Sequence, residues 1–174
     1  MAATTSTRSA LRRFVLAAGI ALAAIGLLGV EVAPLRRLAV PVDGVRIADL
    51  RDAFVDRRGG HRDAAIDIAA APGTAVLAAD DGTVVEILRS SSGALTIHQL
   101  DPDRRYAYSY AHLDRRADGI GEGRRVRRGD VLGYVGTDGN APPDSPHLRF
   151  AVVRLGADKD WRRGEAVDPF EAFE

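Results

Sequence analysis

The chain has 174 residues, which is enough for one domain of ordinary size and a short additional segment. Acidic and basic residues balance at 24 each, so the overall charge gives no indication of a nucleic-acid partner. The absence of cysteine excludes disulfides, thiol nucleophiles and Cys-ligated zinc, and any metal must be bound by His, Asp or Glu.

The N-terminal part is typical of a membrane-targeting segment. Residues 1–13 are polar and basic, and residues 14–30 form an uncharged apolar run that predicts a hydrophobic helix. We interpret 14–34 as a signal anchor or a signal peptide. The lack of a clean small-x-small cleavage site after the run favours an anchor, with 1–13 in the cytoplasm and the remainder exported. Residues 35–50 are then predicted to be a linker, and 51–174 a folded domain.

The folded part is predicted to be all-β. Ile47, Leu50 and Phe54 follow a helical spacing and predict one short helix. Beyond it, short apolar runs are separated by turn residues, which predicts an antiparallel sheet, sandwich or barrel. The expected strands are 64–69, 75–79, 83–88, 94–99, 106–112, 131–135 and 148–153. The C-terminal tail is expected to pack across a sheet edge.

Polar side chains that can bind a metal cluster at the start of the first strand. His61 and Asp63 follow a Gly-Gly turn, and Asp67 lies inside an apolar run between Ile66 and Ile68. Because side chains alternate along a strand, Asp67 faces away from these two isoleucines. The pattern fits either a platform for a metal or fixed cation, or a carboxylate that simply faces solvent.

Two of the remaining histidines are placed where a site would need them. His112 ends the strand that contains an alternating tyrosine ladder, and His147 begins the last predicted strand, whereas His98 is expected to be structural or exposed. The ladder favours cross-strand packing over a groove wall for an extended ligand. Two histidines at strand ends together with Asp67 are the groups that a hydrolytic zinc site requires.

Four segments resemble the lysostaphin/LytM-type zinc metallopeptidases, which cut peptide cross-links in bacterial cell walls. They are AIDIAAAPGTAVLAADDGTVV, YSYAHLD, GEGRRVRRGDVLGYVGTDGNAPPDSPHLRFAV and, more weakly, AVDPFEAF, and together they extend over about residues 50–172. The resemblance implies a groove-bearing, split antiparallel sheet with a hammerhead-like arrangement. It also implies a zinc ion bound by a His, an Asp and the second His of an HLHF segment.

Residue by residue, this chain departs from that pattern at two of the three ligand positions. Asp67 matches the ligand Asp, and His112 and His147 match the two catalytic histidines. Asp63 stands at the position of the first ligand His, and Arg149 at the position of the last. Arginine is permanently protonated and has no lone pair for a metal. We therefore hypothesise that a bridge between Arg149 and the carboxylates of Asp63 and Asp67 replaces the zinc.

Two functions follow from these alternatives. In the first, zinc catalysis is impaired or lost, and the domain binds peptidoglycan peptides or a wall amidase in the cell envelope, either anchored to the inner membrane with the domain in the periplasm or secreted. In the second, His61, Asp63 and Asp67 form a shifted zinc site, and the protein is an active murein endopeptidase. A lipoyl- or biotinyl-carrier function is disfavoured, because the only lysine, Lys159, lies outside the region of similarity.

Overall fold

The computed structural model describes residues 34–50, 65–91, 93–137 and 145–174. From Leu35 onward, these residues belong to one compact unit, Leu35–Glu174. Asp63, His61 and the apolar run 14–30 lie outside the described residues. The long apolar helix of a membrane span does not occur in the part of the chain that is described.

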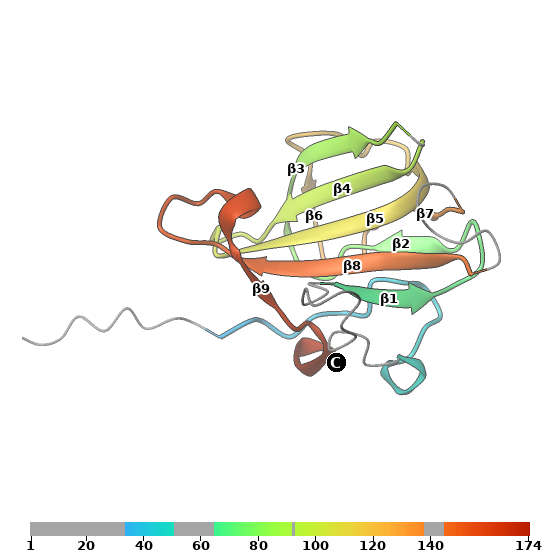
Figure 1. Ribbon diagram of the computed structural model, residues 1–174, viewed down its shortest axis with the longest axis horizontal. Helices are drawn as coiled ribbons and strands as arrows, with labels where there is room; N and C mark the ends of the chain where they lie inside the picture. The colour runs from blue at the N-terminus through green and yellow to red at the C-terminus, as the bar shows by residue number, and fades with distance from the viewer. Residues whose placement is uncertain (1–33, 51–64, 92, 138–144) are drawn as a thin grey trace, which may run out of the picture. The chain divides into compact units, whose positions relative to one another are not determined.

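The described residues form a single antiparallel sheet, which confirms the predicted all-β class. The main path of the sheet runs β1-β8-β5-β4-β3-β6, and Figure 1 shows five of these strands stacked in the order β3, β4, β5, β8 and β1. The strands are β1 (Ile66–Ala69), β2 (Ala75–Leu77), β3 (Gly82–Arg89), β4 (Leu95–Leu100), β5 (Tyr106–Arg116), β6 (Arg125–Val126), β7 (Val131–Val135), β8 (His147–Arg154) and β9 (Glu165–Val167). Outside the main path, β7 pairs with both β2 and β5, and β9 pairs with β8.

Two details of the prediction need correction. Strands β6 and β9 were not expected, because two or three residues are too few to show a periodic pattern. The expected helix is also shorter than its spacing suggests. A single 3-10 turn, Ile47–Asp49, ends at Leu50, which is extended with ψ 138°, while Phe54 lies outside the described residues.

The segment expected to be a linker contributes to the core. Leu38 and Val42 are almost completely buried, and they form bridges to Phe173 and Val76, respectively. The tail packs along the sheet as expected, since β9 pairs with β8 and the Phe173 side chain is buried.

The tyrosine ladder packs inside the protein, which is the alternative that the sequence favours. Tyr106, Tyr108 and Tyr110 are 3%, 0% and 0% exposed, and the rings of Tyr108 and Tyr110 lie against Phe150. Phe150 also contacts Phe173, so one aromatic cluster joins β5, β8 and the C-terminal tail.

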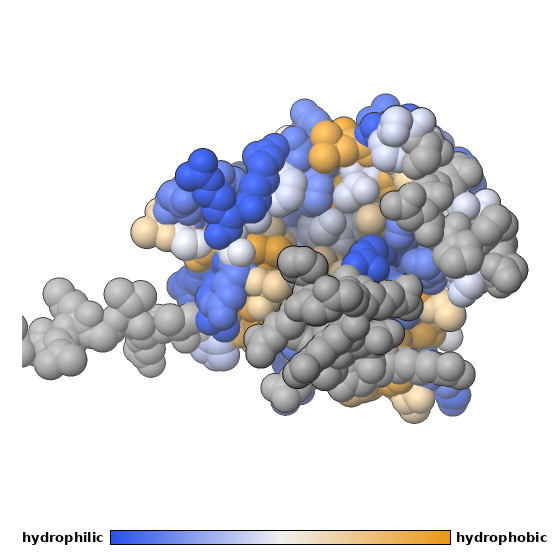
Figure 2. All heavy atoms as spheres, in the orientation of Figure 1, coloured by the Kyte–Doolittle hydropathy of each residue, from blue (hydrophilic) through white to orange (hydrophobic). Residues whose placement is uncertain are grey.

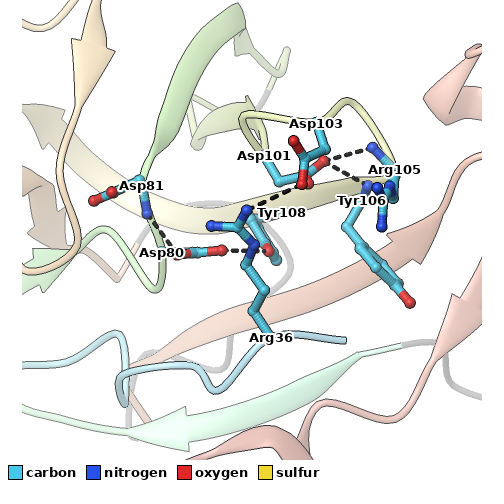
Figure 3. Close-up of polar contacts among 8 residues, drawn as sticks. All are labelled: Arg36, Asp80, Asp81, Asp101, Asp103, Arg105, Tyr106 and Tyr108. Carbon is cyan, nitrogen blue, oxygen red and sulfur yellow. Dashed lines mark hydrogen bonds and ion pairs between the residues drawn. The ribbon is translucent and has the colours of Figure 1, made fainter. Parts of the chain in front are cut away.

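The tyrosine hydroxyls are satisfied by a buried polar network. The Ala79 N–H donates to the Tyr110 hydroxyl oxygen (3.0 Å), and this hydroxyl donates to Gln99 Oε1 (2.8 Å). Gln99 Nε2 donates to the Asp80 carbonyl (2.7 Å), and the Tyr108 hydroxyl donates to Asp80 Oδ2 (3.2 Å), a contact drawn in Figure 3. Burial raises the pKa of both tyrosine hydroxyls and of the Asp80 carboxyl above their usual values. The network fixes the β2–β3 connection against the centre of the sheet.

His98 is buried against the connection between β8 and β9. Its ring stacks on Trp161 with centroids 4.0 Å apart, and Arg162, whose guanidinium carbon lies 4.5 Å from the centre of the indole ring, bonds Glu86 at 2.6 Å. Figure 2 shows hydrophilic residues gathered over this connection. Leu155 and Trp161 are apolar contacts of this connection with the sheet, and His98, only 7% exposed, has a structural position.

Replacing Tyr110 with Phe should destabilise the fold. The substitution leaves the Ala79 N–H and Gln99 Oε1 without their partner in the core, which costs about 1–3 kcal/mol. Chemical denaturation measures the change. Tyr134→Phe is the matched control, because Tyr134 is only half-buried, and its effect should stay within about 0.5 kcal/mol. Equal effects of the two substitutions would contradict the role of the network.

The His98 environment should make stability depend on pH. Burial lowers the pKa of His98 below 6.5. The negative charge of Glu86 opposes this shift to a smaller extent, and the positive charge of Arg162 adds to it. The folded state therefore binds the proton more weakly than the unfolded state, and stability present above pH 6.5 is lost as the pH falls below it. Denaturation at pH 7.5 and 5.5 should show a larger loss for the native chain than for His98→Phe, which keeps an aromatic ring beside Trp161. Parallel pH profiles would refute this prediction.

Candidate functional site

Three strands bring the predicted site residues together. Asp67 comes from β1, His147 and Arg149 come from β8, and His112 comes from β5. The antiparallel register places Arg149 directly between Asp67 on one side and Ala111 on the other. Cross-strand neighbours on one face lie about 5 Å apart, so this register brings the side chains of Arg149 and Asp67 within contact distance of each other.

Arg149 pairs with Asp67 in the structure. Arg149 Nη1 lies 3.1 Å from Asp67 Oδ1 and 3.5 Å from Oδ2, and both side chains are about one-third exposed. The Asp67 part of the hypothesised bridge is thus present, while Asp63 lies outside the described residues. The Arg149 guanidinium is therefore paired with the carboxylate that would be a zinc ligand in the lysostaphin/LytM-type family.

His147 is oriented by a main-chain carbonyl. Its Nδ1 lies 2.8 Å from the Ser145 oxygen, and because a carbonyl only accepts, Nδ1 carries the proton. The other ring nitrogen, Nε2, faces Asp67 Oδ1 at 3.7 Å. Nε2 is therefore the ring nitrogen that His147 presents to the cluster.

His112 lies at an irregular point of β5. Strand β5 pairs with β8 as far as Ala111 and with β7 from Leu113 onward, and its pairing with β4 contains a bulge at the same place. His112 has φ 64°, a left-handed conformation that is uncommon for residues other than glycine. Its carbonyl accepts from the Gly136 N–H at 2.8 Å. Such a bulge changes the direction in which a side chain points, and the His112 ring meets His147 edge-on, with centroids 4.9 Å apart.

Sequence reasoning missed two features that position these groups. The bulge at His112 has no sequence signal here, since neither glycine nor an extra turn residue marks it. The Ser145 carbonyl that orients His147 also has none, because every residue carries a carbonyl. Within the described residues, no three His, Asp or Glu side chains converge in a group that could hold a metal ion.

Comparisons with known proteins agree with the sheet and the motifs. Residues 61–169 match the family model of peptidase family M23, which is more than half of the chain. The catalytic domain of the antimicrobial peptidase lysostaphin from Staphylococcus simulans is 25% identical, with a TM-score of 0.54 over 65% of this chain and 80% of that one. A putative peptidase M23 from Pseudomonas aeruginosa is 30% identical, with a TM-score of 0.51 over 68% of this chain and 45% of that one.

A structure of Csd3 from Helicobacter pylori shares the fold. It is 23% identical, with a TM-score of 0.58 over 80% of this chain, and the chain spans 33% of its length. The chain belongs to peptidase family M23, and its fold is that of the lysostaphin/LytM-type peptidoglycan peptidase domain. That family is zinc-dependent in general and acts on the cell wall, consistent with a place in the cell envelope or outside the cell.

Removing the two charges of the Asp67–Arg149 pair separately and together should reveal coupling. Because both side chains are partly exposed, a double-mutant cycle with Asp67→Ala and Arg149→Ala should give a coupling free energy of about 0.5–1 kcal/mol. Screening in 1 M NaCl should reduce this coupling. Chemical denaturation provides the four free energies of unfolding. The matched control is Arg154–Glu165, a more exposed pair at 3.3 Å, where we expect a smaller coupling. A coupling of zero at Asp67–Arg149 would mean that the pair does not stabilise the fold.

Proposed function

We propose that this protein is a peptidoglycan-directed M23 domain of the cell envelope that acts by binding wall peptides, with zinc catalysis lost. The contact between Arg149 and Asp67 is the observation that supports this function most directly. A guanidinium at hydrogen-bond distance from a carboxylate neutralises the charge that would attract a dication.

The described residues do not fit a zinc ion of the family's kind. Such a site needs three protein ligands and an open position for water. Asp67 is engaged by Arg149, and Arg149 itself cannot coordinate a metal. We therefore assign no catalytic step to a metal in this protein.

The groups that remain suit peptide recognition. His147 directs one ring nitrogen toward the cluster, His112 lies beside it, and the Arg149–Asp67 pair adds further polar groups on the same face. A peptide main chain carries one donor and one acceptor at each residue, so fixed imidazoles and a guanidinium can bind it without cleaving it. Anchoring through residues 14–34, with the domain on the outer side of the inner membrane, would hold this surface against the wall.

The deciding experiment measures binding, cleavage and metal content on the full-length chain in detergent. We expect the native chain to co-sediment with purified peptidoglycan, to release no peptide fragments from it, and to hold no zinc after dialysis against trace zinc. Arg149→Ala and His147→Ala should weaken co-sedimentation several-fold. Arg163→Ala, which removes a charge from an exposed turn elsewhere, should not.

Restoring the family's ligands provides the complementary test. The double variant Asp63→His, Arg149→His should bind about one zinc per chain, because it supplies two imidazoles beside the Asp67 carboxylate. Adding Asp67→Ala to that variant should remove the metal again. Zinc-dependent cleavage by the native chain that His61→Ala abolishes would instead establish the active enzyme with a shifted site. A native chain that binds only a wall amidase would overturn the peptide-binding function.

A further inference from the structure

An arginine-lined cleft lies at the opposite end of the sheet path from the Asp67 cluster. It has a volume of about 780 Å³ and borders β6 and the start of β3, whereas Asp67 lies on β1. Arg124, Arg125 and Arg127 line it together with Asp81 and Asp130. All three arginines are exposed, so their guanidiniums are accessible to a ligand.

The two acidic residues that line the cleft accept hydrogen bonds from the main chain of the neighbouring turn. Asp130 Oδ2 accepts the Arg127 N–H at 2.8 Å, and Asp81 Oδ1 accepts the Arg128 N–H at 2.9 Å. These bonds fix the turn that presents the arginines. Among the residues that the structure describes, none of the three lining guanidiniums forms an ion pair. A hydrogen bond from the main chain leaves a carboxylate charged, so the lining carries three positive and two negative charges.

The neighbouring acidic residues are also engaged within the protein (Figure 3). Asp80 accepts from the Asp81 N–H and the Tyr108 hydroxyl, and Asp101 accepts from the main chain of Arg105 and Tyr106. Asp103 pairs with Arg36 at 3.0 Å. The exposed guanidiniums of Arg124, Arg125 and Arg127 are the groups of the cleft that can bind an anion, and guanidiniums bind phosphate oxygens in a bidentate manner.

The turn that carries the arginines is joined to the start of the folded domain. Arg128 Nη1 donates to the Arg37 carbonyl at 3.2 Å, and the same side chain pairs with Glu174. Arg37 lies seven residues after Val30, the last residue of the apolar run. Seven residues span at most about 25 Å, so a chain anchored through 14–30 would be long enough for this turn to reach the membrane surface.

We propose that the cleft binds the phosphate of an anionic phospholipid head group, which would hold the domain against the membrane. The proposal uses the predicted anchor and is independent of whether the Asp67 cluster binds or cleaves peptide. Each basic residue close to an anionic surface strengthens binding about fivefold, so the three arginines together should contribute about a hundredfold at low salt.

Energy transfer can test the contact on the full-length chain. The chain has no cysteine, so Asp118→Cys in the connection between β5 and β6 provides a unique site for a donor dye. The labelled protein is placed in lipid nanodiscs that carry an acceptor on the head groups. Discs of phosphatidylcholine with 30% phosphatidylglycerol should give higher transfer than discs of phosphatidylcholine alone. The difference should disappear in the triple variant Arg124→Gln, Arg125→Gln, Arg127→Gln, and also for the native chain in 0.5 M NaCl.

The matched control removes three arginines elsewhere, with Arg46→Gln, Arg89→Gln, Arg163→Gln, and should keep the difference. Thermal unfolding checks that both triple variants fold. Equal transfer in the two kinds of disc, or equal loss in the two triple variants, would overturn the proposal. Inorganic phosphate, added at constant ionic strength, separates free phosphate from lipid. Loss of the difference at millimolar phosphate would mean that the cleft is a site for the soluble anion and would overturn the lipid assignment.

Discussion

The register of β8 is the constraint on which both the core and the candidate site depend. This strand lies between β1 and β5, with Phe150 directed into the core and Arg149 onto the opposite face. Because side chains alternate along a strand, a slip of one residue would bury the Arg149 guanidinium and expose the Phe150 ring. The aromatic cluster around Phe150 thus determines which side chain meets Asp67. The ion pair follows from the apolar packing behind it.

The fold could be predicted from the sequence because its strands are separated by strong turn signals. Residues 131–135 were predicted with the observed bounds, and the tyrosine ladder was correctly assigned to packing. The helical spacing of Ile47 and Leu50 was misleading, since only a 3-10 turn forms before the chain becomes extended. In this part of the chain, the path is determined by the bridges of the preceding segment to Val76 and Phe173, and local helix propensity does not determine it.

The candidate site was predictable in its composition but not in its geometry. Asp67 and Arg149 are in register because two strands with clear patterns pair in antiparallel fashion, and the family resemblance indicated which positions matter. The conformation of His112 depends on the exchange of partners by β5, from β8 to β7, which no local pattern records. The orientation of His147 likewise depends on a carbonyl two residues earlier.

The structure also separates the geometry of the histidines from any need for a metal. A residue held at φ 64° costs about 1–3 kcal/mol and persists only where its surroundings impose it. At His112, the surroundings that impose it are the bulge and the Gly136 bond, both made by the main chain. The Arg149–Asp67 pair then joins β1 to β8 as a bound zinc would in the resembling family. The positions of the two imidazoles therefore follow from main-chain contacts, and they are compatible with a catalytic site and with a binding site alike.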